Sequence, residues 1–245
     1  MLSRYSLPSG TLLEFYLFGV RRRRLRLSIT RRIFFNCAPS LAASALTLIP
    51  IERELSFLTY AQAHDVQPAD LMAPGPLPDH LLGSSTATVT IVEYASMTCS
   101  HCAAFALLTY PALKKEFIDT GKVRYVAREF PLDALAAAAS MLIRSVDADR
   151  YYPVMESLFQ EQRQWQSGDP IQSLMTFAVT RLGFTESSFN ECLANKDLLD
   201  RIMQMRDRAA KFGVSSTPTF FINGDKFGNT TIRQWEDRIA SYLKT

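Results

Sequence analysis

The sequence predicts an α/β fold, in which a central mixed sheet flanked by helices is interrupted by an inserted all-helical subdomain. Strand-forming runs occur at 88–94 and 123–130, the pattern is helical throughout 132–212, and strand signals return at 219–224. Hydrophobic residues make up 47% of the 245-residue chain, enough for a sizeable core in one domain with appendages.

Residues 1–63 have the order of an export signal. Arginines cluster at positions 21–32, an uncharged apolar stretch follows at 33–51, and the small residues Ala61 and Ala63 flank Gln62. The sequence TRRIFF also resembles a twin-arginine export motif, while an uncleaved membrane anchor and an amphipathic targeting peptide are the alternatives. We expect export to the periplasm, with removal of the signal after Ala63 or Ala45.

Residues 64–85 contain several prolines and are expected to form an extended lead-in. Residues 86–131 then form the first half of the fold. The β-branched run in TVTIVEY (88–94) indicates a buried strand, and a helix over 103–117 follows, in which Pro111 is expected to produce a kink.

Residues 132–212 are expected to form the helical insertion, with five helices. Asp169 and Pro170 make an N-cap and first-turn pair, and Gly183 is a typical helix stop. Cys192 lies at helical spacing from Phe189, which favours a small buried hydrophobe over a third redox thiol.

Residues 213–245 complete the fold. The sequence VSSTPTFFING leads from a loop into a strand, and Asn223-Gly224 is a strong hairpin signal. Thr231 is expected to cap a last amphipathic helix.

Charge argues against a nucleic-acid partner. The net charge of +3 reflects the arginines of the first 63 residues, and the remainder is slightly acidic. It contains no basic patch interleaved with aromatic residues.

The motif Cys99-Ser100-His101-Cys102 carries the predicted chemistry. It follows a strand and opens a helix, so unpaired backbone N–H groups and the helix dipole favour a thiolate at Cys99. A protonated His101 adds positive potential, and both effects lower the pKa of Cys99. A stabilised thiolate favours the reduced form, which makes the disulfide an oxidant.

A CxxC pair can also be half of a zinc site or a structural disulfide. A zinc site needs two more ligands, and the chain offers only Cys37, Cys192, His64 and His80, none of which form a second pair. A structural disulfide stabilises most when it closes a long loop, which this pair does not. We therefore expect redox chemistry, with no metal and no cofactor.

CSHC together with VSSTPTFFING resembles the DsbA-like thiol:disulfide oxidoreductases over about residues 84–245. The resemblance implies a thioredoxin fold, with Cys99 as the nucleophile and Cys102 as the resolving cysteine. It also implies a cis Thr217-Pro218 peptide beside the disulfide, and it matches Glu93 to a family carboxylate beneath the active site that is implicated in proton transfer.

The residues on either side of Glu93 in the sequence support the same role. Val92 and Tyr94 indicate burial, which would raise the pKa of Glu93 and suit it to handling the Cys102 proton. Ser100 departs from DsbA proper, which has proline there, so the potential is expected to differ from that of a strong oxidase.

The expected function is a monomeric periplasmic thiol oxidase for exported proteins with free cysteines. Backbone at Thr217 and Pro218, next to Ser100, is expected to pair with an extended substrate. The resemblance implies reoxidation by a quinone-linked membrane partner of the DsbB type. The alternatives are a disulfide isomerase or reductase kept reduced by a membrane thiol donor, a binding or chaperone module with incidental cysteines, and a metal-handling protein.

Overall fold

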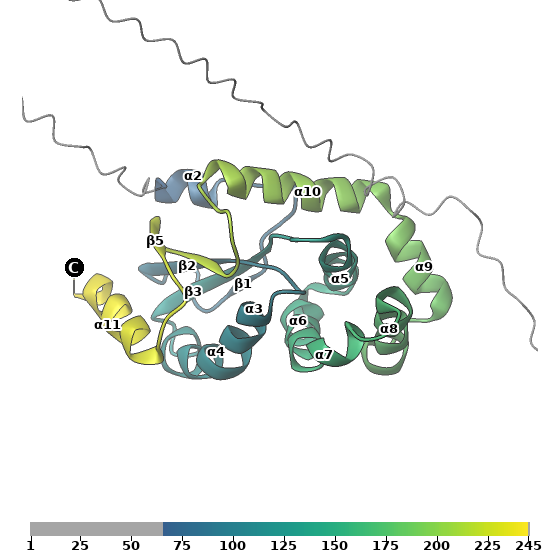
Figure 1. Ribbon diagram of the computed structural model, residues 1–245. Coiled ribbons are helices and arrows are strands. Elements are labelled where there is room, and N and C mark those ends of the chain that lie inside the picture. Colours follow the sequence, from purple (N-terminus) through teal and green to yellow (C-terminus); the bar gives the residue numbers. More distant parts are fainter. Residues whose placement is uncertain (1–65, 245) are drawn as a thin grey trace, which may run out of the picture. The chain divides into compact units, whose positions relative to one another are not determined.

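The computed structural model describes residues 66–244, and at its centre lies a five-stranded mixed sheet (Figure 1). The strands lie side by side in the order β1-β3-β2-β4-β5. Only β2 and β3 run parallel to each other, and the other neighbours are antiparallel. The strands are β1 Leu81–Leu82, β2 Val89–Ala95, β3 Val123–Glu129, β4 Thr219–Ile222 and β5 Asp225–Phe227. The mixed sheet predicted from the sequence is confirmed.

All seven residues of β2 are buried, because the strand lies in the middle of the sheet with helices on both faces. Successive side chains of a strand point to opposite faces. Val92 and Tyr94 join a core cluster on one face, and Ile91 joins the larger cluster on the other. Glu93 therefore points to the same face as Ile91.

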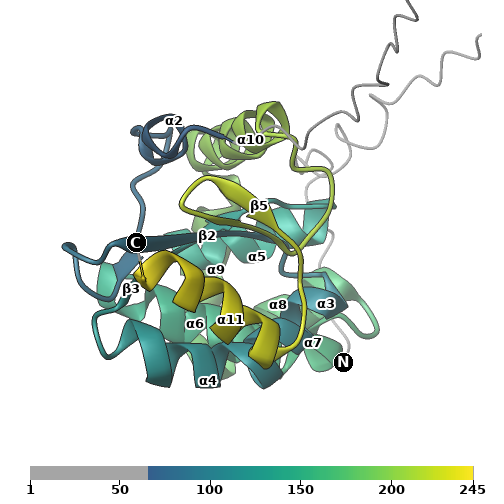
Figure 2. The ribbon, with the colours of Figure 1, turned by 90° about the vertical axis from the view of Figure 1, so that its left-hand side faces the viewer.

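Two helical layers sandwich the sheet (Figure 2). One face is covered by α2 (Pro68–Met72) and α10 (Lys196–Lys211). The other is covered by α11 (Ile232–Leu243) and by the helical segment that begins at the cysteine motif. Trp235 and Ile239 of α11 are fully buried there.

The helical segment that begins at the motif is not one regular helix. It consists of α3 (Ser100–Ala104), a π-helical turn η1 (Phe105–Thr109), α4 (Tyr110–Leu113) and a second π-helical turn η2 (Lys114–Ile118). Pro111 lies in the first turn of α4, where a missing N–H costs little. The π-helical turn η1 ends just ahead of Pro111 and interrupts the α-helical hydrogen-bond ladder there. The expected kink at Pro111 stays a prediction.

The insertion is helical, as predicted, but two of its details differ. The predicted helix over 152–165 is divided at Glu161, whose φ of −103° and ψ of 20° are not helical. The last helix, α10, leaves the insertion and packs on the sheet through Ala209. The other elements are α5 Ala134–Arg144, the 3₁₀ turn η3 Ala148–Arg150, α6 Tyr151–Gln160, α7 Gln162–Trp165, α8 Pro170–Phe177, the π-helical turn η4 Ala178–Leu182 and α9 Glu186–Ala194.

The prediction of a wholly extended lead-in is wrong. Pro68 occupies the first turn of α2, a position that favours proline, and Leu71 of that helix is buried against the sheet. Further on, β1 pairs with β3 at the edge of the sheet. Residues 1–65, with the predicted export signal, lie outside the described residues. No helix within 66–244 is long and apolar enough to cross a membrane.

A buried ion pair fastens the insertion to the sheet. Arg144 of α5 donates two hydrogen bonds to the Glu129 carboxylate of β3, at 2.6 and 2.8 Å, and both side chains are at most 3% exposed. The Tyr151 hydroxyl donates to the same carboxylate at 2.9 Å.

Replacing Arg144 with methionine should lower the free energy of unfolding by about 3–5 kcal/mol, because the Glu129 charge stays buried without its partner. Arg201→Met is the matched control: Arg201 forms an exposed pair with Asp197, whose loss costs about 0.5 kcal/mol or less. Denaturant unfolding of the full chain measures both. Equal effects of the two substitutions would contradict this account.

Candidate active site

Cys99 stands where the turn after β2 enters α3. It is the N-cap of that helix, with extended backbone, and its Sγ accepts a hydrogen bond from the Cys102 N–H at 3.4 Å. Cys99 is partly exposed, whereas Cys102, one turn later, faces the core and is fully buried. Both are thiols in this structure. The pair therefore has one accessible sulfur and one enclosed sulfur.

The loop before β4 lies directly against Cys99. The Thr217-Pro218 peptide is cis, the geometry that the resemblance implies. The Cys99 thiol donates to the Thr217 carbonyl oxygen at 3.3 Å, although the two residues are 118 positions apart. Pairing of Tyr94 with Thr219 in the β2–β4 ladder brings them together.

The pKa of Cys99 is lowered from its ordinary 9.0 to about 5. Hydrogen bonding from the Cys102 thiol is the largest cause, and partial burial opposes it. The Thr217 side chain and the backbone N–H groups of Cys102 and His101 lower the pKa further. The Thr217 hydroxyl is buried and has no other hydrogen-bond partner within 66–244, so it is free to donate to a thiolate.

Cys102 and Glu93 form the buried half of the site. Burial raises the pKa of Cys102, and both its hydrogen bond to Cys99 and the charge of Glu93 add to the increase. Glu93 is 2% exposed, and burial raises its pKa to about 8, against the hydrogen bond that it accepts from Tyr125. This agrees with the expectation of a buried carboxylate. A group that titrates near neutral pH is suited to exchange a proton.

His101 and Ser100 lie on the outer side of the motif. Both residues are exposed, and they directly follow the partly exposed Cys99 in the chain. The part of His101 that acts on the pKa of Cys99 in this structure is its backbone N–H. A contribution from the imidazole charge stays a prediction.

Sequence reasoning missed Gln162, which joins the insertion to the motif. This side chain of α7 is 7% exposed, and its Nε2 donates to the carbonyl oxygens of Met97 and Cys99 at 2.8 and 3.1 Å. A second tie joins Thr98 to Asp133, the N-cap of α5, at 2.6 Å. The cap spacing of Asp133 is visible in the sequence, but a lone glutamine in a helix gives no signal.

Cys192 is buried in α9, in line with its interpretation as a small core residue. Its Sγ lies 2.9 Å from the Ser145 Oγ, and burial raises the pKa of Cys192. Within the described part of the chain, no group of three or more His, Cys, Asp or Glu side chains is arranged to hold a metal ion.

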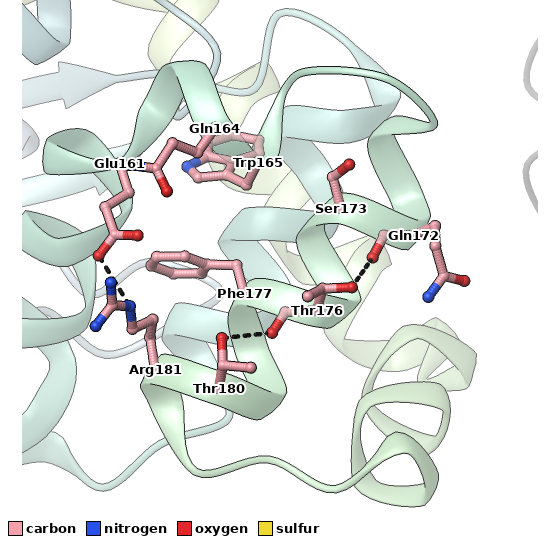
Figure 3. A pocket seen from close by; sticks show the side chains of 9 residues that line it. All are labelled: Glu161, Gln164, Trp165, Gln172, Ser173, Thr176, Phe177, Thr180 and Arg181. Atoms are coloured by element: carbon pink, nitrogen blue, oxygen red, sulfur yellow. Dashed lines mark hydrogen bonds and ion pairs between the residues drawn. The ribbon is translucent and has the colours of Figure 1, made fainter.

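Two cavities lie away from the cysteines. One, of about 430 Å³, runs between α7 and α8, with Trp165 and Phe177 among its lining residues and the Glu161–Arg181 ion pair at one side (Figure 3). The other, of about 690 Å³, lies beside β1 and is lined in part by Tyr152. Neither is lined by the cysteines or by the residues around the cis peptide.

Comparison with known proteins places this geometry in a family. Residues 77–241 match the family model described as Thioredoxin. A Rickettsia typhi protein that bears the name of a protein-disulfide oxidoreductase is 31% identical over 156 residues, which are 63% of this chain and 58% of the relative. The chain thus spans less than two thirds of that relative.

This chain also resembles solved structures, and it covers a larger share of their length. The chain is 31% identical to Wolbachia pipientis alpha-DsbA1, with a TM-score of 0.64 over 72% of this chain and 96% of that one. BdbD from Bacillus subtilis, at 22% identity, shares the fold with a TM-score of 0.61 over 68% and 94% of the two chains. The chain therefore belongs to the thioredoxin family and, within it, to the DsbA-like proteins.

Proposed function

We propose that the protein is a thiol oxidase that donates a Cys99–Cys102 disulfide to other proteins with free cysteines. The observation that carries this proposal is the opposite direction of two pKa shifts, lowered at Cys99 and raised at Cys102. One sulfur is stable as a thiolate leaving group, and the other holds its proton. Such a pair favours the reduced form more than an ordinary dithiol does, so its disulfide is the more readily passed to a substrate.

The transfer takes two steps. A substrate thiolate attacks the Cys99 Sγ, the Cys99–Cys102 bond breaks, and Cys102 leaves with the electron pair and takes a proton, for which Glu93 is the proposed donor. A second substrate thiolate then attacks the substrate sulfur of the mixed disulfide, and Cys99 leaves as a thiolate. The substrate dithiol loses two electrons, and the enzyme disulfide gains them.

The lowered pKa of Cys99 sets an upper limit on how strongly the reduced form is favoured. At pH 7, a thiol with a pKa of about 5 is stabilised by at most ~2.7 kcal/mol relative to one that stays protonated. Cys99 is only partly buried, so solvent screening reduces this to ~1–2 kcal/mol. That corresponds to about 20–40 mV toward the oxidising side for this two-electron couple.

The cis-peptide loop is the proposed substrate platform. Thr217 and Pro218 lie beside Cys99, and β4 continues directly from them. An extended substrate that pairs with this backbone is held without regard to its side chains. The exposed Ser100 directly follows Cys99 in the chain.

The setting of the reaction is also a proposal. The Arg-rich, apolar order of residues 1–63 supports export to the periplasm, where disulfides persist. There the protein would act as a monomer on exported proteins and be reoxidised by a quinone-linked membrane partner of the DsbB type, as in the proteins it resembles.

The oxidised protein should convert a reduced, unfolded dithiol protein to its disulfide form with one equivalent per bond. Cys99→Ala should abolish this, because no accessible sulfur remains to form the mixed disulfide. Cys192→Ala is the matched control and should keep full activity. Rapid reshuffling of a scrambled test protein, with slow net oxidation, would instead favour an isomerase or reductase.

The stability of the reduced protein should rise relative to that of the oxidised protein between pH 5 and pH 9. A folded-state pKa of about 5 against an unfolded value near 9 adds stability that is complete above pH 9 and lost as the pH falls toward 5. Glu93 acts in the opposite direction, and because burial is the largest cause of its raised pKa, its contribution should largely cancel between the two redox forms. Paired denaturant titrations measure it, and a difference that does not change with pH would contradict the lowered pKa of Cys99.

A further inference from the structure

Glu93 meets its hydrogen-bond partner on the neighbouring strand. The Tyr125 hydroxyl of β3 donates to Glu93 Oε2, and both side chains are at most 2% exposed. Within residues 66–244, no other side chain hydrogen-bonds to this carboxylate. The parallel register of β2 and β3 places Ile91 opposite Tyr125, so the tyrosine lies diagonally beside Glu93 on the same face.

We propose that Tyr125 is a positioning residue for proton transfer, whose hydroxyl holds the Glu93 carboxylate in place, stabilises its charged form and so sets the pH at which it accepts the Cys102 proton. The inference rests on the proposed role of Glu93. A buried carboxylate with a single donor depends strongly on that donor, because little else compensates its charge.

Tyr125 is suited to donate a hydrogen bond and not to exchange its own proton. Burial raises its pKa well above 10, so the phenol keeps its hydrogen at neutral pH. The titratable groups coupled electrostatically to Glu93 come from three directions, and only Tyr125 and Cys99 among them shift its pKa. The coupled groups are Cys99 and Cys102 of the motif, Tyr125 of β3, and Tyr110 and Tyr152 of α4 and α6.

The step that reports on Glu93 is closure of the mixed disulfide during reoxidation. With glutathione bonded to Cys99, the Cys102 proton passes to the Glu93 carboxylate. The Cys102 thiolate attacks the Cys99 Sγ, and glutathione leaves as a thiolate. The closure rate should follow the carboxylate fraction of Glu93. Its half-plateau should fall at or somewhat below pH 8, because Cys99 is uncharged in the mixed disulfide and no longer raises the pKa of Glu93.

The test is the pH profile of this closure in the full chain. The reduced protein is mixed rapidly with oxidised glutathione and quenched with acid, and mass spectrometry quantifies the mixed disulfide and the closed disulfide. Tyr125→Phe should move the midpoint up by about one pH unit, so that closure at pH 7 slows about tenfold. Tyr110→Phe is the matched control. The Tyr110 ring lies 5.2 Å from the Tyr125 ring, and its buried hydroxyl has no hydrogen-bond partner in the described part of the chain. Removing that hydroxyl should therefore leave the midpoint unchanged.

Glu93→Gln separates the role of Glu93 from the role of Tyr125. This substitution should remove the midpoint from the pH profile and leave a slow closure rate that rises with pH without a plateau. Adding Tyr125→Phe to Glu93→Gln should not change the closure rate further. If Glu93→Gln keeps the wild-type profile, the proposed role of Glu93 falls. If Glu93→Gln removes the midpoint but Tyr125→Phe matches Tyr110→Phe, the role of Tyr125 is overturned.

A variant that strengthens the hydrogen bond from position 125 keeps the proposal testable if Tyr125→Phe does not fold. Difluorotyrosine placed at position 125 keeps the ring and the hydroxyl but is a stronger hydrogen-bond donor. It should move the midpoint to lower pH. An unchanged or raised midpoint would overturn the assignment of Tyr125.

Discussion

The antiparallel pairing of β2 with β4 is the interaction on which the site depends. Cys99 follows β2 and Thr217 precedes β4, so this one ladder places the Cys99 sulfur 3.3 Å from a carbonyl 118 positions away. A register slip would turn alternate side chains to the wrong face, moving Glu93 away from the motif. Complete burial of β2, with apolar clusters on both faces, makes such a slip costly.

The two cysteines owe their different chemistry to one helical turn. Position 99 is the N-cap, where backbone N–H groups point at a half-exposed sulfur, and position 102 turns into the core. The helical insertion supports this arrangement from outside, since Gln162 holds the carbonyls of Met97 and Cys99. The insertion is thus part of the frame that fixes the N-cap, in addition to covering the sheet.

Prediction from the sequence succeeded where a short local pattern of residues determines the structure. The β-branched run, the cap residues and the Asn223-Gly224 turn predicted their elements, and the neighbours of Glu93 predicted its burial. It failed for contacts that need tertiary packing. Nothing local says that α10 will cross the sheet or that Gln162 will reach Met97, 65 positions away. The cis peptide before β4 came from resemblance, since an isolated Thr-Pro pair favours trans.

A stabilised Cys99 thiolate is what would make the Cys99–Cys102 disulfide an oxidant. The most direct measurement is the reduction potential of the Cys99–Cys102 couple, found by equilibration in glutathione buffers and quantification of the two forms. Our account predicts a potential above the about −220 to −260 mV of a glutathione pool. A value near thioredoxin's, about −270 mV, would contradict it and favour a reductase.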